Sequence, residues 1–145
     1  MSLKTALVYH LKNDDGVSAL VGARVFPQFG KEGIAYPYIV FNRVSTARHP
    51  EMEAASGLVS SRVQIDVWDN DPLTAQNVAE AVRAALDGYT NTTMGSGDHT
   101  CAVHRIMLDG QRDTFSPPLE GKEDGAYGEQ LDFVVIHTES VPTFD

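Results

Sequence analysis

The fold is decided between Leu58 and Gly88, where the chain reads LVSSRVQIDVWDNDPLTAQNVAEAVRAALDG. From residue 59 to 67, apolar and polar side chains largely alternate, which is typical of a half-buried strand. After Trp68 the apolar spacing changes to three and four residues, which predicts an amphipathic helix. Asp71 and Pro72 supply an N-cap and a first-turn proline, and Gly88 ends the helix. A strand that leads into a helix through a short turn indicates a small α+β domain.

The helix and the strand should form the centre of the core. We expect the helix face of Val78, Val82 and Leu86 to pack on the apolar side chains of the strand. An aspartate at Val82 would then place an unpaired carboxylate inside the core.

The remaining segments predict a leading helix and three further strands in one domain that spans residues 1–145. The helix covers Leu3–Asn13, and the strands cover 38–45, 101–108 with an extension toward Phe115, and 126–138. Residues 17–21 suggest a short helical piece, 24–27 an edge segment, and 89–98 a loop. The order helix, strand, strand, helix, strand, strand predicts an α+β fold. It has one four-stranded, mostly antiparallel sheet with two helices packed on one face.

Composition and charge narrow the possible functions. The 145 residues carry 20 acidic and 11 basic side chains, a net charge of −9. Such a chain lacks the basic surface of a general nucleic-acid binder, although an acidic wall would let DNA pass without specific binding. The single cysteine, Cys101, excludes an internal disulfide, and no run approaches the roughly 18 apolar residues of a membrane span.

Two polar regions are candidate assembly surfaces. The segment Ala47–Gly57 is longer than a hairpin turn needs, so we predict an arm that orders against a neighbouring molecule. Its members of interest are Arg48, His49, Glu51, Met52 and Glu53. A second set is expected to form a cross-strand polar face on the side of the sheet away from the helices. That set is Arg43, Arg62, Gln64, Asp66 and Asp132. Its alternatives are a solvated face, a subunit contact and a channel lining.

A small metal-dependent enzyme is the alternative from another class. Asp66, Asp69 and Asp71 are near one another in sequence, and carboxylates suit hard cations. The spacing fits no EF-hand, and Asp71 is better used as a helix cap. His104 is expected to be a partly buried, hydrogen-bonded side chain, and no His-Glu-x-x-His or Cys-x-x-Cys motif supports zinc. We therefore predict no catalytic residues, no metal and no cofactor.

Several segments together resemble a known family. They are GARVFP at 22–27, YPYIVF at 36–41, RVQIDVW at 62–68, and the alanine-rich helix that ends at LDG, 86–88. In this order the chain, from about Leu3 to Thr138, resembles the tail-completion proteins of long-tailed phages, prophages and gene transfer agents. These proteins are also called tail terminators or tail-to-head joining proteins.

The resemblance implies a non-enzymatic virion protein. It implies a homo-oligomer, commonly a hexameric ring, that caps the head-proximal end of the tail tube and joins it to a head connector or adaptor protein. Assembly would take place in the host cytoplasm, and DNA would pass through the ring. A head-tail adaptor or a minor tail protein is the alternative within the same particle.

Overall fold

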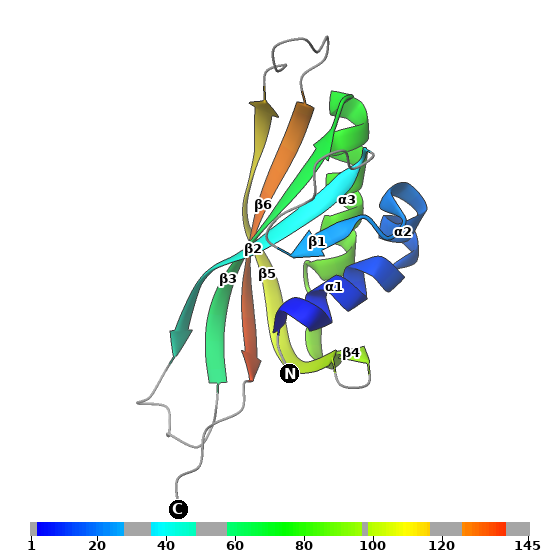
Figure 1. Ribbon diagram of the computed structural model, residues 1–145. Coiled ribbons are helices and arrows are strands. Elements are labelled where there is room, and N and C mark those ends of the chain that lie inside the picture. Colours follow the sequence, from blue (N-terminus) through cyan, green and yellow to red (C-terminus); the bar gives the residue numbers. More distant parts are fainter. Residues whose placement is uncertain (1–2, 28–35, 49–57, 97–98, 117–125, 139–145) are drawn as a thin grey trace, which may run out of the picture.

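The computed structural model describes residues 3–27, 36–48, 58–96, 99–116 and 126–138 (Figure 1). Within these ranges the chain forms three helices and six strands. The helices are α1 (Leu3–Asn13), α2 (Asp15–Val21) and α3 (Pro72–Leu86). The strands are β1 (Val25–Pro27), β2 (Tyr38–Arg48), β3 (Leu58–Asp69), β4 (Thr90–Ser96), β5 (His99–Ser116) and β6 (Ala126–Thr138). None of these helices has the length and apolar character needed to cross a membrane.

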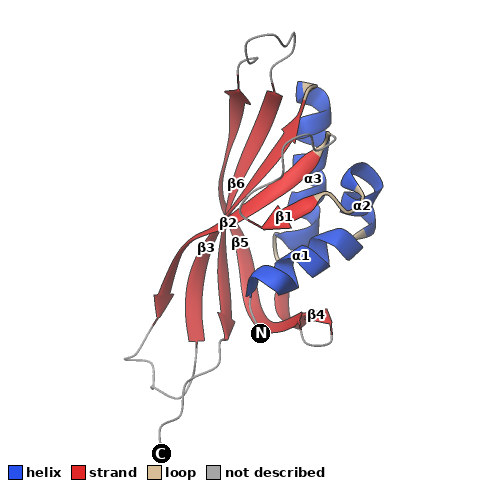
Figure 2. Cartoon of the chain, viewed as in Figure 1, coloured by secondary structure: helices blue, strands red, loops and turns tan. Residues whose placement is uncertain are grey.

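All described strands belong to one twisted mixed sheet, in the order β1-β2-β3-β6-β5-β4. Only β1 and β2 run parallel, and every other described pair is antiparallel. The helices gather on one side of the sheet (Figure 2). The other side of β3, β6 and β5 is therefore free of helices within the described part of the chain.

The core lies between α3, α1 and the sheet, as the alternation in β3 predicts. Val78, Val82 and Leu86 of α3 are fully buried, and they join Ile65 and Val67 of β3 in one apolar cluster. Contacts between α3 and β3 confirm that the predicted faces meet.

The turn before α3 also follows the prediction. The Asp71 carboxylate accepts hydrogen bonds from the backbone N–H of Thr74 at 3.2 Å and from its hydroxyl at 2.8 Å. The Asp69 carboxylate accepts the Asp71 N–H at 2.9 Å, so two acids, two residues apart, fix the start of the helix.

The expected α+β fold, with a four-stranded sheet and two helices, is wrong. The described chain forms a mostly-sheet fold with six strands and three helices. The short strand β1 adds to one edge, and α2 is a helix in its own right, capped by Asp14. Strand β4 adds to the opposite edge, although its polar composition, TNTTMGS, is typical of a loop. It pairs with β5 because the buried Met94 anchors it opposite Cys101.

Candidate assembly surfaces

A row of polar side chains crosses the helix-free face of the sheet. On β3, Arg62, Gln64 and Asp66 alternate with the buried residues that face the helices. On the neighbouring strand β6, Asp132 is paired with Gln64, and Gln130 is paired with Asp66. The sheet therefore gathers acids, bases and amides from adjacent strands onto one surface.

Two ion pairs organise this polar face. Arg62 Nη1 lies 2.7 Å from Asp109 Oδ2, and Arg112 Nη1 lies 2.9 Å from Asp132 Oδ2. Both arginines and Asp109 have about half of their side-chain surface exposed. Solvent-exposed pairs of this kind contribute little to folding stability. Their value is to hold charges of both signs in fixed positions where a partner surface can meet them.

Asp66 is a partly buried acid on the polar face. Burial raises the pKa of its carboxyl. Hydrogen bonds from Gln64 and Gln130 and the charge of Arg112 act in the opposite direction. The Gln64 amide donates to both carboxylate oxygens, at 3.2 and 3.3 Å.

The structure brings together four of the five residues predicted for this face: Arg62, Gln64, Asp66 and Asp132. The backbone of Arg43 pairs with Val63, whose side chain belongs to the core, and the Arg43 side chain lies outside the described atoms.

The sequence prediction missed Asp109 and Arg112. Simple alternation from Leu108 along β5 would place Arg112 on the helix side. The register shifts between Leu108 and Gly110, so the chain after the bulge changes face. Gly110 is the signal that could have indicated it, since an isolated glycine in a strand often marks a bulge.

The predicted arm begins later than expected. Ala47 and Arg48 belong to β2, where Arg48 pairs with Val59 of β3. The strand thus continues beyond the predicted end at Ser45. Residues 49–57, which include the other four arm residues, lie outside the described residues.

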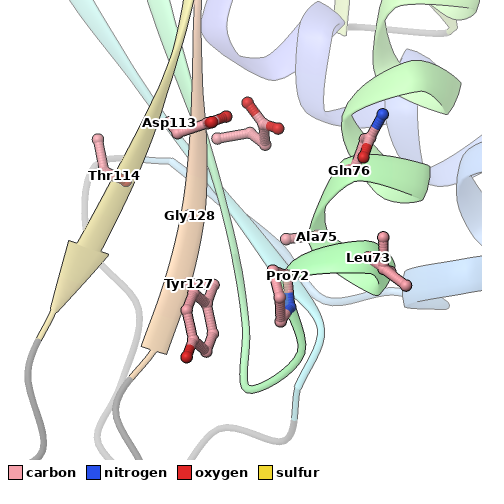
Figure 3. A pocket seen from close by; sticks show the side chains of 9 residues that line it. Pro72, Leu73, Ala75, Gln76, Asp113, Thr114, Tyr127 and Gly128 are labelled. Carbon is pink, nitrogen blue, oxygen red and sulfur yellow. The ribbon is translucent and has the colours of Figure 1, made fainter.

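A pocket of about 300 Å³ opens at the N-terminal end of α3 (Figure 3). Pro72 and Leu73 form its helix side, while Asp113 of β5 and Tyr127 of β6 face them across the opening. Two apolar side chains that line it are unusually exposed, Leu73 at 67% and Tyr127 at 38%, and the adjacent Phe115 is 53% exposed. The rings of Phe115 and Tyr127 contact each other, with centroids 5.0 Å apart. The pocket therefore has an apolar rim.

The wall of this pocket is acidic. Glu129, only 9% exposed, lies opposite Asp113 in the strand register. Burial raises the pKa of Glu129, and the hydrogen bond and charge of Asp113 and the charge of Glu80 raise it further. The Gln111 amide donates weakly to Glu129, at 3.5 Å. Among the described residues, no lysine or arginine forms an ion pair with Glu129 or Asp113.

A buried polar chain crosses the sheet at its other end. The Thr46 and Ser61 hydroxyls are 3.1 Å apart, Ser61 Oγ is 2.8 Å from His137 Nε2, and His137 Nδ1 is 3.7 Å from Cys101 Sγ. A thiol beside an imidazole is a combination that hydrolases use. Here, however, Cys101 is only 8% exposed, and burial raises the pKa of its thiol, which disfavours the reactive thiolate. This series of side-chain contacts provides partners for buried polar groups on four strands.

The carboxylates and histidine considered for a metal site have other partners. Asp69 and Asp71 cap the turn before α3, whereas Asp66 lies on the polar face. His104 is exposed, contrary to the expectation of partial burial, and its Nε2 lies 2.8 Å from Thr138 Oγ1. In the described ranges, no group of three histidine, cysteine, aspartate or glutamate side chains is placed to hold a metal ion.

Comparison with known proteins identifies a family and a similar solved structure. The family described as "Tail completion protein gp17" matches residues 5–115. A chain from a solved structure, "Virion of native gene transfer agent (GTA) particle", has a similar fold, with a TM-score of 0.68 and 19% sequence identity. The alignment covers 95% of this chain and 96% of that one. No curated protein sequence matches the chain.

Proposed function

Because the chain belongs to the tail completion protein gp17 family, we propose that this structural protein of a virion tail forms a homo-oligomeric ring, a hexamer. The ring caps the head-proximal end of the tail tube and joins it to the head connector. The observation that carries the proposal is the family match over residues 5–115. It is supported by the fold shared, over nearly the whole chain, with a protein of a gene transfer agent virion.

The two outer strands cover only parts of the sheet edges. Strand β1 has three residues, pairs with residues 39–41 of β2 and ends at Pro27, which has no N–H to donate to a further strand. Strand β4 pairs with residues 99–105 of β5. Within the described part of the chain, residues 42–48 of β2 and 109–116 of β5 therefore have a strand partner on one side alone. The polar face and the acidic pocket are candidates for side-chain contacts between subunits, and these strand edges are candidates for backbone contacts.

The charges of the chain suit a ring through which DNA passes. The polar face combines arginines and aspartates, and the whole chain carries a net charge of −9. A surface with this balance releases few counterions from DNA phosphates and so binds DNA weakly and without sequence preference. It can still fix the register between protein subunits, because paired charges of opposite sign discriminate against wrong orientations.

The mass of the assembly tests the proposal. Light scattering would be measured from micromolar to near-millimolar protein, alone and with the tail-tube protein of the same particle. We expect a ring, or a tube capped at one end, in at least one condition. A dilute monomer alone would agree with the proposal, since ring contacts can require the tube. A monomer at every concentration and with the tube protein would refute it.

A further inference from the structure

The acidic pocket and the exposed face of α1 lie at opposite ends of α3. The pocket opens at the first turn of α3, beside Pro72 and Leu73. Helix α1 packs at the last turn, where His10 Nε2 lies 3.0 Å from the Ala85 carbonyl oxygen and the His10 ring contacts Tyr89. A helix of 15 residues is about 20 Å long, so the two surfaces are well separated on the subunit.

The exposed face of α1 carries an aromatic ring and a cation side by side. Tyr9 is 41% exposed although it is a large side chain, and Lys12 is exposed in the last turn of the same helix. Residues three positions apart lie on the same face of a helix. In the described part of the chain, Lys12 forms no ion pair. This face therefore offers an apolar contact and a free ammonium group to another molecule.

The pocket has the complementary chemistry. Its rim is apolar, and its wall holds the buried carboxyl of Glu129 beside Asp113, with no basic partner among the described residues. Lysine has an apolar stem and a charged end, so it can pass an apolar rim and place its ammonium group against carboxylates. An ammonium group there would also relieve the repulsion between the neighbouring acids.

We propose that the pocket receives Lys12 of a second copy of this chain, with Tyr9 of that copy packing on the rim formed by Leu73, Phe115 and Tyr127. The contact joins two different surfaces, so each subunit keeps one free pocket and one free α1 face for the next copy. Head-to-tail contacts of this kind generate rings when the rotation closes. The inference rests on the proposed ring and specifies which surfaces form its joints.

Charge reversal on each side of the contact tests it. Lys12→Glu places an acid against the pocket, and Asp113→Lys places a cation against the α1 face. Both positions are exposed, so the folded subunit should tolerate the changes. Each variant alone should lose at least about tenfold in its association constant, because like charges at an interface are strongly unfavourable. Lys4→Glu makes the same charge change more than two turns away on α1 and should assemble as the parent does.

Mixing the two variants gives the sharpest readout. In a ring that alternates Lys12→Glu with Asp113→Lys subunits, one joint is the parental pair and the next is the reversed pair. Both joints are complementary, so an equimolar mixture should recover assembly that neither variant shows alone. Thermal unfolding of each variant at low concentration controls for folding. If either reversal unfolds the subunit, Lys12→Gln and Asp113→Asn replace it, and each should weaken association.

The outcomes separate this contact from the proposed function. Variants that form rings as well as the parent would overturn the contact and leave the ring intact. Loss of assembly without recovery in the mixture would also overturn the pairing. Loss only with Asp113→Lys would assign the pocket to a different protein of the particle. A parent protein that remains monomeric even with tail-tube protein would refute the ring itself.

Discussion

Gly128 lies where the sheet leaves no room for a side chain, and its replacement by alanine gives a quantitative test of the structure. It pairs with Thr114 on one side and Trp68 on the other. A Cβ atom at Gly128 would clash with the Thr114 hydroxyl oxygen and would lie 3.0 Å from two ring carbons of Trp68. The hydroxyl oxygen is itself buried without a hydrogen-bond partner in the described structure.

The expected cost follows from two opposing terms. Forcing a methyl group into a well-packed site costs about 1–3 kcal/mol. Restricting the unfolded chain by replacing glycine returns about 0.4–1 kcal/mol. We expect Gly128→Ala to lower the free energy of unfolding by about 1–2 kcal/mol, which corresponds to a fall of about 3–8 °C in Tm for a chain of this size. Gly110→Ala is the matched control, because its nearest non-neighbour atom, an Asp132 oxygen, is 3.9 Å away.

A double-mutant cycle identifies the clashing group. Thr114→Ala removes the hydroxyl, so combining it with Gly128→Ala should recover much of the lost stability. Thr114→Val keeps the branched shape, so it should stabilise the parent but rescue Gly128→Ala less than alanine does. Denaturant unfolding of dilute protein, followed by circular dichroism, gives these free energies. Equal stability of Gly128→Ala and the parent, or equal rescue by valine and alanine, would refute the packing described for this site.

Three further results are expected. Val82→Asp should cost more than about 3 kcal/mol in unfolding free energy, because it buries an unpaired carboxylate, whereas Ala84→Asp on the exposed side of α3 should cost less than about 1. Burial raises the pKa of Glu129 in the folded protein above its ordinary value of 4.5, so the unfolded chain releases this proton at a lower pH than the folded protein does. The parent should therefore lose stability as pH rises from the unfolded-state pKa to the folded-state pKa of Glu129. Glu129→Gln should flatten that slope and raise Tm at neutral pH; an unchanged slope would contradict the assignment. Replacing residues 49–57 by a four-residue Gly-Ser linker should leave Tm within about two degrees and weaken tail capping, whereas a large loss of Tm would show that the segment packs on its own subunit.

The parts of the fold that could be predicted from sequence are those with long, regular periods. Strand β3 and helix α3 each bury one face, so their apolar spacing identifies the element and the side that enters the core. Strand β1 is too short to show a period, but Pro27 and the extended residues before it predicted an edge segment at 24–27, which the structure confirms. Strand β4 could not be predicted, because it is polar and is held in the sheet by pairing with β5. Tertiary contacts override local preference at that edge.

The candidate surfaces, too, contain residues that periodicity within one strand predicts and residues that it does not. The β3 and β6 members of the polar face follow from alternation within each strand, whereas Asp109 and Arg112 depend on a register shift that alternation does not contain. The acidic pocket depends on residues from α3, β5 and β6 that are far apart in sequence. The functional prediction came from the resemblance to a known family, because we found no binding or catalytic motif in the sequence.

Because of the bulge in β5, the chain could become one residue shorter without changing which side chains lie on each face of the sheet. Pairing with β6 passes from Leu108 to Gly110, so Asp109 is an extra residue that the hydrogen-bonded ladder does not use. A homologue that lacks this single residue would keep Arg112 on the polar face and Asp113 at the pocket. It would lose only the carboxylate that binds Arg62. Sequence alignments in this region should therefore allow a one-residue gap at Asp109, since a gap placed a few residues later would exchange the two surfaces.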